Sequence, residues 1–311
     1  MNHLSSGTPV PDRRRAYLFA AAAILLWSTV ATAFELALRG LRPLALLAIA
    51  AATSALCLAL VLAARGRLAR LARLRPQDLA RGALLGLCGP FAYYWVLLGA
   101  YDRLPAQQAQ PLNYVWPITL ALLAVPLLGQ PLRRRTLPAA LLGLAGVAVI
   151  STRGHLGALA VDDPLGVALA VGSSLLWALY WIGCLKSQID EDLRLLLAFA
   201  FGALFAGAAA LLTGATFAAP APALAAAVYV GLFEMGVTFV LWQRALALAG
   251  SAAQVGVLVF ITPFLSLIPI RLILGEAIHS ATLVGLALIV IGVLVESADD
   301  LRALLRARRP A

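Results

Sequence analysis

The sequence predicts an all-α integral membrane protein in which ten transmembrane helices form two inverted five-helix repeats. Three observations predict this class. Of the 311 residues, 62% are hydrophobic and only 12% are charged, whereas soluble domains carry about 25% charged residues. Ten apolar runs come close to the roughly 20 residues that a helix needs to cross a bilayer. Similar short segments also recur in the two halves of the chain.

The composition excludes several other classes of protein. A chain with so few charges cannot cover a soluble enzyme with a polar surface, and it is too apolar for a disordered protein. Its cysteines, Cys57, Cys88 and Cys184, all lie in apolar runs without a CxxC pattern or a Cys/His cluster. The sequence therefore predicts no disulfide framework, no metal site and no bound cofactor.

The first half of the chain contains five apolar runs, bounded by charged residues, Pro or Gly. The first run follows Arg13–Arg15, the second starts at Pro43, and the third ends before Asp102. The fifth is short, and we expect its neighbours to extend it. The predicted spans are 16–38, 43–64, 79–99, 105–128 and 136–152.

The second half repeats this arrangement after a short connection, from Arg153 to Pro164, which we expect outside the cell. Its predicted spans are 164–186, 193–213, 222–246, 251–275 and 280–298. The chain is thereby divided into a tail (1–15), a first unit (16–152), the connection (153–163), a second unit (164–298) and a basic tail (299–311).

The distribution of basic residues sets the predicted orientation. If the N-terminus is cytoplasmic, 19 of the 24 Lys and Arg residues fall in cytoplasmic segments and five in external ones. This excess follows the positive-inside rule and explains the net charge of +10 without a nucleic-acid partner. Both termini are expected in the cytoplasm. Arg13–Arg15 and Ala31–Ala33 also imitate a cleavable signal peptide, but the first run has a counterpart in mid-chain, so we expect it to be retained.

The two halves share matched positions. Ile24–Trp27 resembles Ser174–Trp177, which lies 150 residues later. Further on, an offset of 146 relates Ala106 to Ala252, Pro117 to Pro263, Gly129 to Gly275, Thr136 to Thr282 and Gly146 to Gly292. Because five is odd, the second half enters the membrane inverted relative to the first, as in many secondary transporters.

These residues resemble the drug/metabolite transporter superfamily. The segment from Ala252 to Gly292, with Pro263 and Gly275-Glu276, looks like the second half of an EamA-type domain, although Gln130 replaces the acid that the pattern would place in the first half. Tyr93-Tyr94-Trp95 and Trp116-Pro117 are similar to segments of bacterial aromatic amino-acid exporters. The resemblance implies two EamA-like repeats around a central cavity.

Helical periodicity independently gathers polar and aromatic side chains on single faces of six helices. Amides and hydroxyls avoid lipid, so these faces are expected to point inward. The candidate substrate-binding residues are Trp27, Tyr94, Gln110, Asn113, Trp116, Trp177, Tyr180, Trp181, Glu234, Trp242 and Gln254. An equally open interpretation is that the polar side chains bridge helices, and some aromatic ones mark the membrane interface.

Two prolines and one acid are singled out by position. Pro117 and Pro263 occupy equivalent places in the two halves and are candidate gating hinges, with static kinks as the alternative. Glu234 lies near the middle of its span, where an ionisable group is costly and indicates a function. It is expected to bind a substrate ammonium or a coupling proton, or to pair structurally. Glu35, Glu276 and Glu296 are expected at the interface.

The leading hypothesis is a secondary transporter that exports amino acids, especially aromatic ones, across the bacterial inner membrane by alternating access. Its partners would be the small-molecule substrate and membrane lipid, and the oligomeric state stays open. The alternatives are a multidrug or other metabolite exporter of the same superfamily, a membrane enzyme and a scaffold. An enzyme is disfavoured because the three His residues form no HExxH pattern, and the lack of a P-loop argues against ATP-driven transport.

Overall fold

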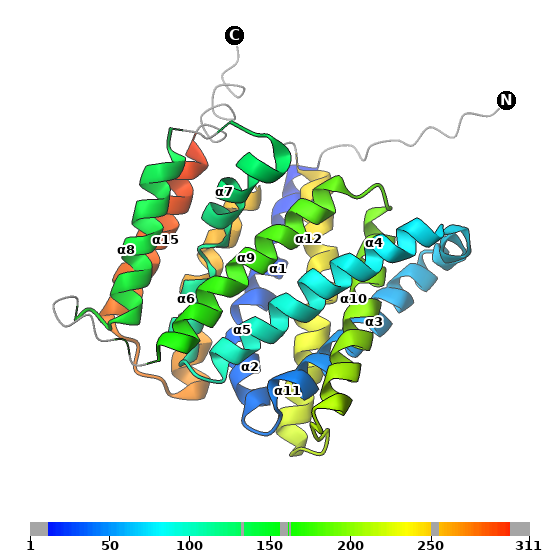
Figure 1. Cartoon of the computed structure of the whole chain (residues 1–311), viewed down its shortest axis with the longest axis horizontal. Coiled ribbons are helices and arrows are strands. Elements are labelled where there is room, and N and C mark those ends of the chain that lie inside the picture. Colours follow the sequence, from blue (N-terminus) through cyan, green and yellow to red (C-terminus); the bar gives the residue numbers. More distant parts are fainter. Residues whose placement is uncertain (1–11, 132–133, 156–160, 162, 250–254, 299–311) are drawn as a thin grey trace, which may run out of the picture.

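A computed structural model describes residues 12–131, 134–155, 161, 163–249 and 255–298, and its regular structure within them is helical (Figure 1). The helices of the first half are α1 (Arg13–Ser28), α2 (Val30–Leu38), α3 (Pro43–Ala64), η1 (Leu68–Arg73), α4 (Pro76–Gly86), η2 (Leu87–Tyr93), α5 (Tyr94–Tyr101), α6 (Ala106–Asn113), α7 (Trp116–Leu128) and α8 (Thr136–Ser151). Those of the second half are α9 (Pro164–Lys186), α10 (Glu191–Leu212), α11 (Ala221–Phe233), α12 (Val237–Leu248), η3 (Val257–Ile261), α14 (Thr262–Pro269), η4 (Ile270–Leu274) and α15 (Ser280–Glu296).

Seven helical segments are long and apolar enough to cross a membrane, counted over the described residues. Three further apolar segments, Thr136–Ser151, Leu258–Leu274 and Ser280–Glu296, are shorter. At 1.5 Å per residue these short segments extend about 25 Å, less than a hydrocarbon core of about 30 Å. The all-helical membrane class is confirmed, while the predicted count of ten spans is met only as seven long and three shorter segments.

Two helix pairs form opposite edges of the bundle (Figure 1). The pair α8 and α15 packs at one edge, and α3 packs on α10 at the other. Each pair takes one helix from each half of the chain. The remaining segments lie between these edges, so the edge pairs hold the two halves together on either side of the centre.

Glycines let α8 and α15 approach closely. A Cβ added to Gly146 would lie 2.5 Å from the carbonyl oxygen of Gly285 and 2.7 Å from Cγ1 of Ile289. Both contacts are shorter than any that real Cβ atoms make, so the helices would have to separate. This explains why small residues stand at these positions.

We expect Gly146→Ala to lower the thermal unfolding temperature of the protein in detergent, because overpacking costs about 1–3 kcal/mol. Gly207→Ala is the matched control, since a Cβ at this position of α10 meets nothing within 4 Å. The control should be neutral or slightly stabilising. Equal unfolding temperatures for the two variants would refute this account of the α8–α15 contact.

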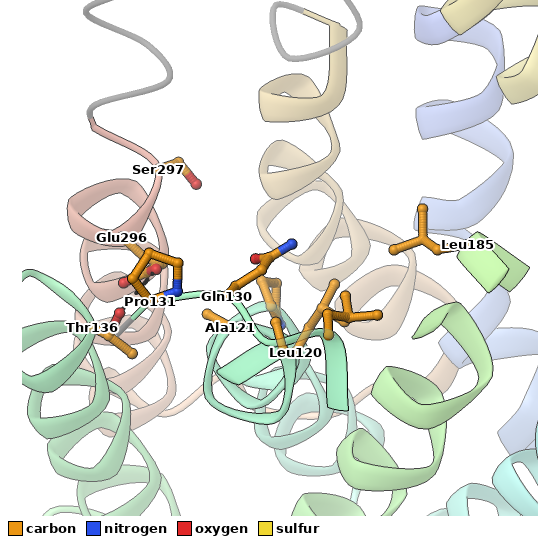
Figure 2. A pocket seen from close by; sticks show the side chains of 11 residues that line it. Leu120, Ala121, Gln130, Pro131, Thr136, Leu185, Glu296 and Ser297 are labelled. Atoms are coloured by element: carbon orange, nitrogen blue, oxygen red, sulfur yellow. Dashed lines mark hydrogen bonds between the residues drawn. The ribbon is translucent and has the colours of Figure 1, made fainter. Parts of the chain in front are cut away.

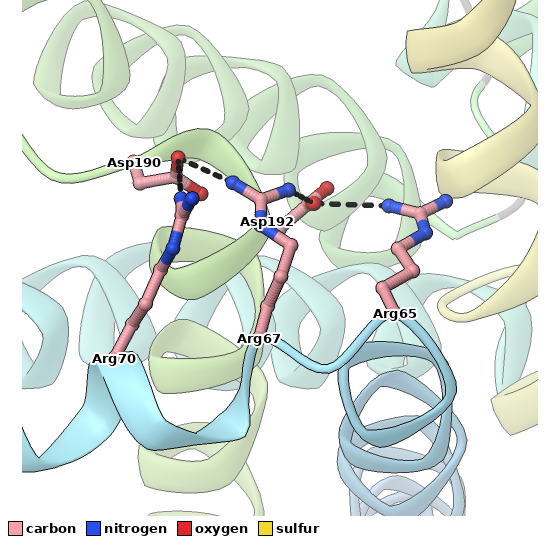
Figure 3. Close-up of polar contacts among 5 residues, drawn as sticks. All are labelled: Arg65, Arg67, Arg70, Asp190 and Asp192. Atoms are coloured by element: carbon pink, nitrogen blue, oxygen red, sulfur yellow. Dashed lines mark hydrogen bonds and ion pairs between the residues drawn. The ribbon is translucent and has the colours of Figure 1, made fainter. Parts of the chain in front are cut away.

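An ionic network joins the other pair where α3 ends and α10 begins (Figure 3). Arg65 and Arg67 both contact the carboxylate of Asp192, with an Arg65 Nη1–Oδ2 distance of 2.9 Å. Asp190 accepts hydrogen bonds from Arg67 at 2.7 Å and from Arg70 at 3.2 Å. We call this end of the bundle, where α1 also begins at Arg13, the basic end. The sequence analysis expects these arginines on one side of the membrane. It does not predict that they form ion pairs with acids of the other half of the chain.

Five of the described apolar segments contain or begin with an irregular stretch, whereas α9 runs unbroken for 23 residues. A break permits bends and frees backbone groups for other partners, which a membrane protein tolerates only around a protein-lined or aqueous interior. The irregular positions are Thr29 between α1 and α2, the π-helical η2, Tyr114–Val115 between α6 and α7, Glu234–Gly236 between α11 and α12, and the 3-10 segment η3 before α14.

Candidate functional site

A central cavity of about 380 Å³ lies among these irregular segments and α9. Its volume falls within the roughly 300–1,000 Å³ typical of small-molecule sites. Eight of the candidate residues from the sequence line it: Trp27, Gln110, Asn113, Trp116, Trp177, Trp181, Glu234 and Trp242. Residues of both halves therefore meet around one space.

Trp177 of α9 is the centre of an aromatic cluster on the cavity wall. Its indole stacks on Tyr93 at 4.4 Å between ring centroids and on Tyr180 at 5.2 Å. The edge of Trp181 approaches it at 5.9 Å, and Phe239 of α12 lies 6.3 Å away. Such contacts hold the rings rigidly, so the cavity offers preformed aromatic surfaces to a ligand.

A second group of rings on the cavity wall belongs to both halves. Trp27 of the first half is 5.3 Å from Trp242 and 5.9 Å from Phe239. Phe239 therefore connects this group to the Trp177 cluster. The wall of the cavity is largely apolar and aromatic as a result.

Glu234 stands where α11 stops and before α12 starts. It lies 13 residues after Ala221 and 14 before Leu248, the ends of that span, so it is near the middle of the membrane. Its side chain lines the cavity. The helix break thus presents a carboxyl group in an otherwise apolar space.

Side chains from other segments satisfy the carbonyls that this break frees. The carbonyl of Phe233 accepts a hydrogen bond from the hydroxyl of Thr238. Trp27 Nε1 donates to the carbonyl of Glu234 at 3.4 Å, and Ser54 Oγ donates to that of Met235 at 2.7 Å. Because unsatisfied carbonyls are expensive at this depth, these three donors stabilise the broken conformation.

Among the described residues, one side chain donates to the Glu234 carboxyl group, which faces the cavity. The hydroxyl of Tyr94 donates to its Oε1 at 3.0 Å. Among the described residues that line the cavity, none is Lys, Arg or His. A cationic group of a ligand is therefore the natural electrostatic partner for the carboxylate.

Neutral polar groups complete the lining. Asn113 accepts from the Tyr93 hydroxyl at 3.2 Å and donates to Ser173 Oγ at 2.8 Å, which fixes the orientation of its amide and leaves one N–H for a further acceptor. Gln110 accepts a hydrogen bond from Ser266 Oγ. Among the described residues, no acceptor is found for the buried Nε1 of Trp181. This N–H group and the amide of Gln110, which lines the cavity, are candidate donors to a ligand.

Three candidate residues lie elsewhere. Tyr94 does not line the cavity, but its hydroxyl donates a hydrogen bond to the carboxyl group of Glu234. Tyr180 is buried on the far side of Trp177, and its ring fills the space above Gly89, where a Cβ would lie 2.4 Å from it. Gln254 lies outside the residues that the structure describes.

Helical periodicity predicts Tyr94 at the cavity wall, but the structure places Tyr93 there. An ideal helical wheel assumes 100° per residue, but Leu87–Tyr93 is π-helical around Pro90. A π turn adds a residue and rotates the side chains that follow. The dipeptide Gly89-Pro90 is the feature of the sequence that indicates a departure from regular helical periodicity at this point. Other lining aromatics that were not among the candidates are Phe34, Tyr101, Tyr114, Phe239 and Phe260.

The two candidate hinge prolines occupy comparable places. Pro117 lies in the first turn of α7, directly after the irregular pair Tyr114–Val115. Pro263 lies in the first turn of α14, directly after η3. A proline is tolerated in a first helical turn because its missing N–H is not needed there. Both prolines therefore mark where a regular helix resumes beside the cavity.

The cavity differs at its two ends. Toward the basic end, its lining reaches Leu185, one residue before the end of α9, and this residue is 66% exposed. Toward the opposite end, it stops at Phe34 and Tyr101, whose rings are 5.1 Å apart and which are both buried. The cavity is therefore closed toward the opposite end and reaches the surface at the basic end.

A second hollow of about 230 Å³ adjoins the first at the basic end (Figure 2). The two share Leu120 and Leu185. Glu296 lines the second hollow and is buried, with Oε1 accepting a hydrogen bond from Thr136 at 3.1 Å. Glu296 is the last residue of α15, and the packing of α8 on α15 encloses it there. Among the described residues, no cluster of His, Cys, Asp or Glu could hold a metal ion.

Comparisons with known proteins match the chain to transporters. The profile of the EamA-like transporter family matches residues 14–152 and again residues 164–297. The chain is 26% identical over 202 residues to the uncharacterized transporter YvbV of Bacillus subtilis, a match that covers 64% of this chain and 65% of YvbV. It is 28% identical over 214 residues to the aromatic amino acid exporter YddG of Ancylobacter novellus, covering 68% of this chain and 73% of YddG.

A solved structure described only as a crystal structure of a protein shares the fold. Its TM-score to this chain is 0.66 at 24% sequence identity, covering 92% of this chain and 99% of the other. At this identity the likeness concerns the fold alone.

Proposed function

Because the chain belongs to the EamA-like transporter family, we propose that this multi-pass membrane protein is a secondary exporter of aromatic amino acids that works by alternating access. Membership of a transporter family implies that the protein moves a small-molecule substrate. The choice of substrate rests on the cavity of this chain. We assign no enzymatic activity to it.

One observation carries the proposal: among the described lining residues, one carboxyl group stands in a cavity walled by aromatic rings. Glu234 is suited to bind the ammonium group of an amino acid, and Trp177 and Trp27 are suited to contact its aromatic side chain. Nε2 of Gln110 and Nε1 of Trp181 supply neutral donors to the substrate carboxylate. The name of YddG, an aromatic amino acid exporter, supports the same choice.

The remaining candidates fit roles around this site. We propose that Asn113, Trp116, Trp242 and Gln254 contact substrate, and that Tyr94 and Tyr180 position Glu234 and Trp177. Pro117 and Pro263 would be hinges, since each begins a regular helix next to an irregular cavity segment. Two matches of one family profile support two EamA-like repeats, 16–152 and 164–298, which we propose to be inverted.

We place the chain in a bacterial inner membrane with both termini in the cytoplasm. The positive-inside rule supports this orientation. The basic end, with Arg13–Arg15 and Arg65–Arg75, then faces the cytoplasm, and the cavity reaches the surface on that side. This is the state in which an exporter loads its substrate.

A second candidate function is the export of lipophilic cations. It is favoured by the lack of a cationic side chain among the described lining residues, because an amino-acid carboxylate must then be held by neutral donors. Aromatic rings and one carboxylate also suit an amphipathic ammonium.

The test is flux of labelled phenylalanine or tryptophan in proteoliposomes, with and without a pH gradient. Saturable flux that unlabelled aromatic amino acids compete for is the expected result, and acceleration by the gradient would implicate Glu234 in coupling. Movement of a labelled lipophilic cation without movement of phenylalanine would select the second function. Flux of neither compound above protein-free vesicles would reject both.

A further inference from the structure

Glu276 lies far from the basic end, in the connection between η4 and α15, and it caps a helix of the other half. Its Oε1 accepts a hydrogen bond from the backbone N–H of Ala106 at 3.0 Å, and its Oε2 accepts from that of Gln107 at 3.3 Å. These are the first two residues of α6, which has no side-chain cap of its own. A carboxylate at a helix N-terminus satisfies orphan N–H groups and interacts favourably with the helix dipole.

The side chain of Gln107 adds a second layer of contacts between the halves. Its Nε2 donates to the carbonyl of Ala277 at 2.9 Å. Its Oε1 accepts from the backbone N–H of His279 at 2.9 Å and from Thr282 Oγ1 at 3.2 Å. The Gln107 side chain is buried, so its bond to Thr282 is shielded from solvent and the other two are partly shielded.

A third layer begins at the cavity itself. Gln110, one helical turn after Gln107, lines the cavity and accepts the hydrogen bond from Ser266 of α14. The layers follow one another from the closed end of the cavity outward: Gln110 with Ser266, then Gln107 with residues 277–282, then Glu276 with the start of α6. Every layer joins a residue of the first half to one of the second.

We propose that Glu276 and Gln107 form the outer gate of the transporter: their contacts between the halves close the cavity toward the external side, and they must break for the substrate to leave. The proposal rests on the transport function proposed above. The cavity ends at the rings of Phe34 and Tyr101, and the gate is built from helix capping and amide hydrogen bonds between the halves at the same end. It can therefore be disrupted without altering the residues that contact the substrate.

The test measures access to the cavity and needs no substrate. Cys57, Cys88 and Cys184 are replaced by Ala, and a reporter is introduced as Ala31→Cys in the cavity wall. A membrane-impermeant maleimide is applied to the membrane side on which Thr216→Cys is labelled and Arg73→Cys is not, since these exposed positions mark opposite ends. The rate of labelling of the reporter is then compared between variants.

We expect slow labelling in the reporter background and at least tenfold faster labelling after Glu276→Ala. Gln107→Leu, which removes the second layer and is similar in size, is an independent second variant with the same expected result. Gel filtration of each labelled protein checks that it is folded. Labelling that stays slow in folded samples of both variants would overturn the gate.

Asp163→Asn is the matched control at the same end. A hydrogen bond from the backbone N–H of Gly166 lowers the pKa of the Asp163 carboxyl, and Arg103 pairs with it at 3.3 Å. This pair also connects the halves, but it is exposed and contributes little, and Asn retains the helix cap. The reporter should stay slow in this variant, and faster labelling would show that loss of any negative charge opens this end. A gate that opens as expected in a protein that moves no phenylalanine would reject the substrate and retain the gate.

Discussion

Replacing Glu234 with Gln should lower the flux of labelled phenylalanine by about 10- to 100-fold, because a buried hydrogen bond to a charged group contributes about 1.5–3 kcal/mol. The amide keeps the size of the side chain and can still accept the hydrogen bond from Tyr94. The variant therefore removes the negative charge and little else. It should also remove any acceleration by a pH gradient, if this carboxyl group carries the coupling proton.

Glu35→Gln is the control for this experiment. Glu35 lies in α2 within a membrane-crossing segment, but it is not part of the cavity wall. Its substitution should leave flux close to that of the unmodified protein. Flux of unmodified rate and pH dependence in Glu234→Gln would exclude Glu234 from the mechanism.

Replacing Trp177 with Ala should raise the phenylalanine concentration needed for half-maximal flux by more than tenfold. The substitution removes the ring on which Tyr93 and Tyr180 both stack, and aromatic pairs contribute about 0.5–1.5 kcal/mol each beyond the area they bury. The variant therefore loses an aromatic surface of the cavity together with the stacking contacts of Tyr93 and Tyr180. Trp177→Phe, which keeps a ring at this position, should restore most of the affinity.

Trp95→Ala is the matched control because Trp95 is 45% exposed and lies outside the cavity wall. It removes an equally large ring from the bundle. We expect little change in half-maximal concentration. An equal loss of affinity in Trp95→Ala and Trp177→Ala would show that the effect comes from general destabilisation and not from the site.

Much of the site could be predicted from the sequence because membrane helices obey simple rules. Polar residues at helical spacing avoid lipid and face the protein interior. From this rule we predict that Trp27, Asn113 and Glu234 face the interior, and all three line the same cavity. The depth of Glu234 followed from counting residues along one span. Both predictions depend only on local periodicity and span length.

The rest of the site depends on departures from ideal helices. The π-helical turn at Pro90 places Tyr93 at the cavity wall, where an ideal helical wheel predicts Tyr94. A helical wheel assumes regular α-helical geometry and therefore contains no such turn. Tyr180 is held against Gly89, which a wheel drawn for one helix cannot reveal. The capping role of Glu276 could not be predicted because its partners are backbone N–H groups 170 residues earlier in the chain, and backbone donors have no signature in the sequence.

The most direct test of the account is whether an aromatic amino acid occupies this cavity. A cysteine introduced as Ala31→Cys lines the cavity and can be alkylated by a small permeant thiol reagent in the background without native cysteines. Saturating phenylalanine should slow its alkylation at least tenfold, alanine should not, and the protection should be lost after Glu234→Gln. Unchanged alkylation in a protein that still transports phenylalanine would place the substrate elsewhere and contradict the account.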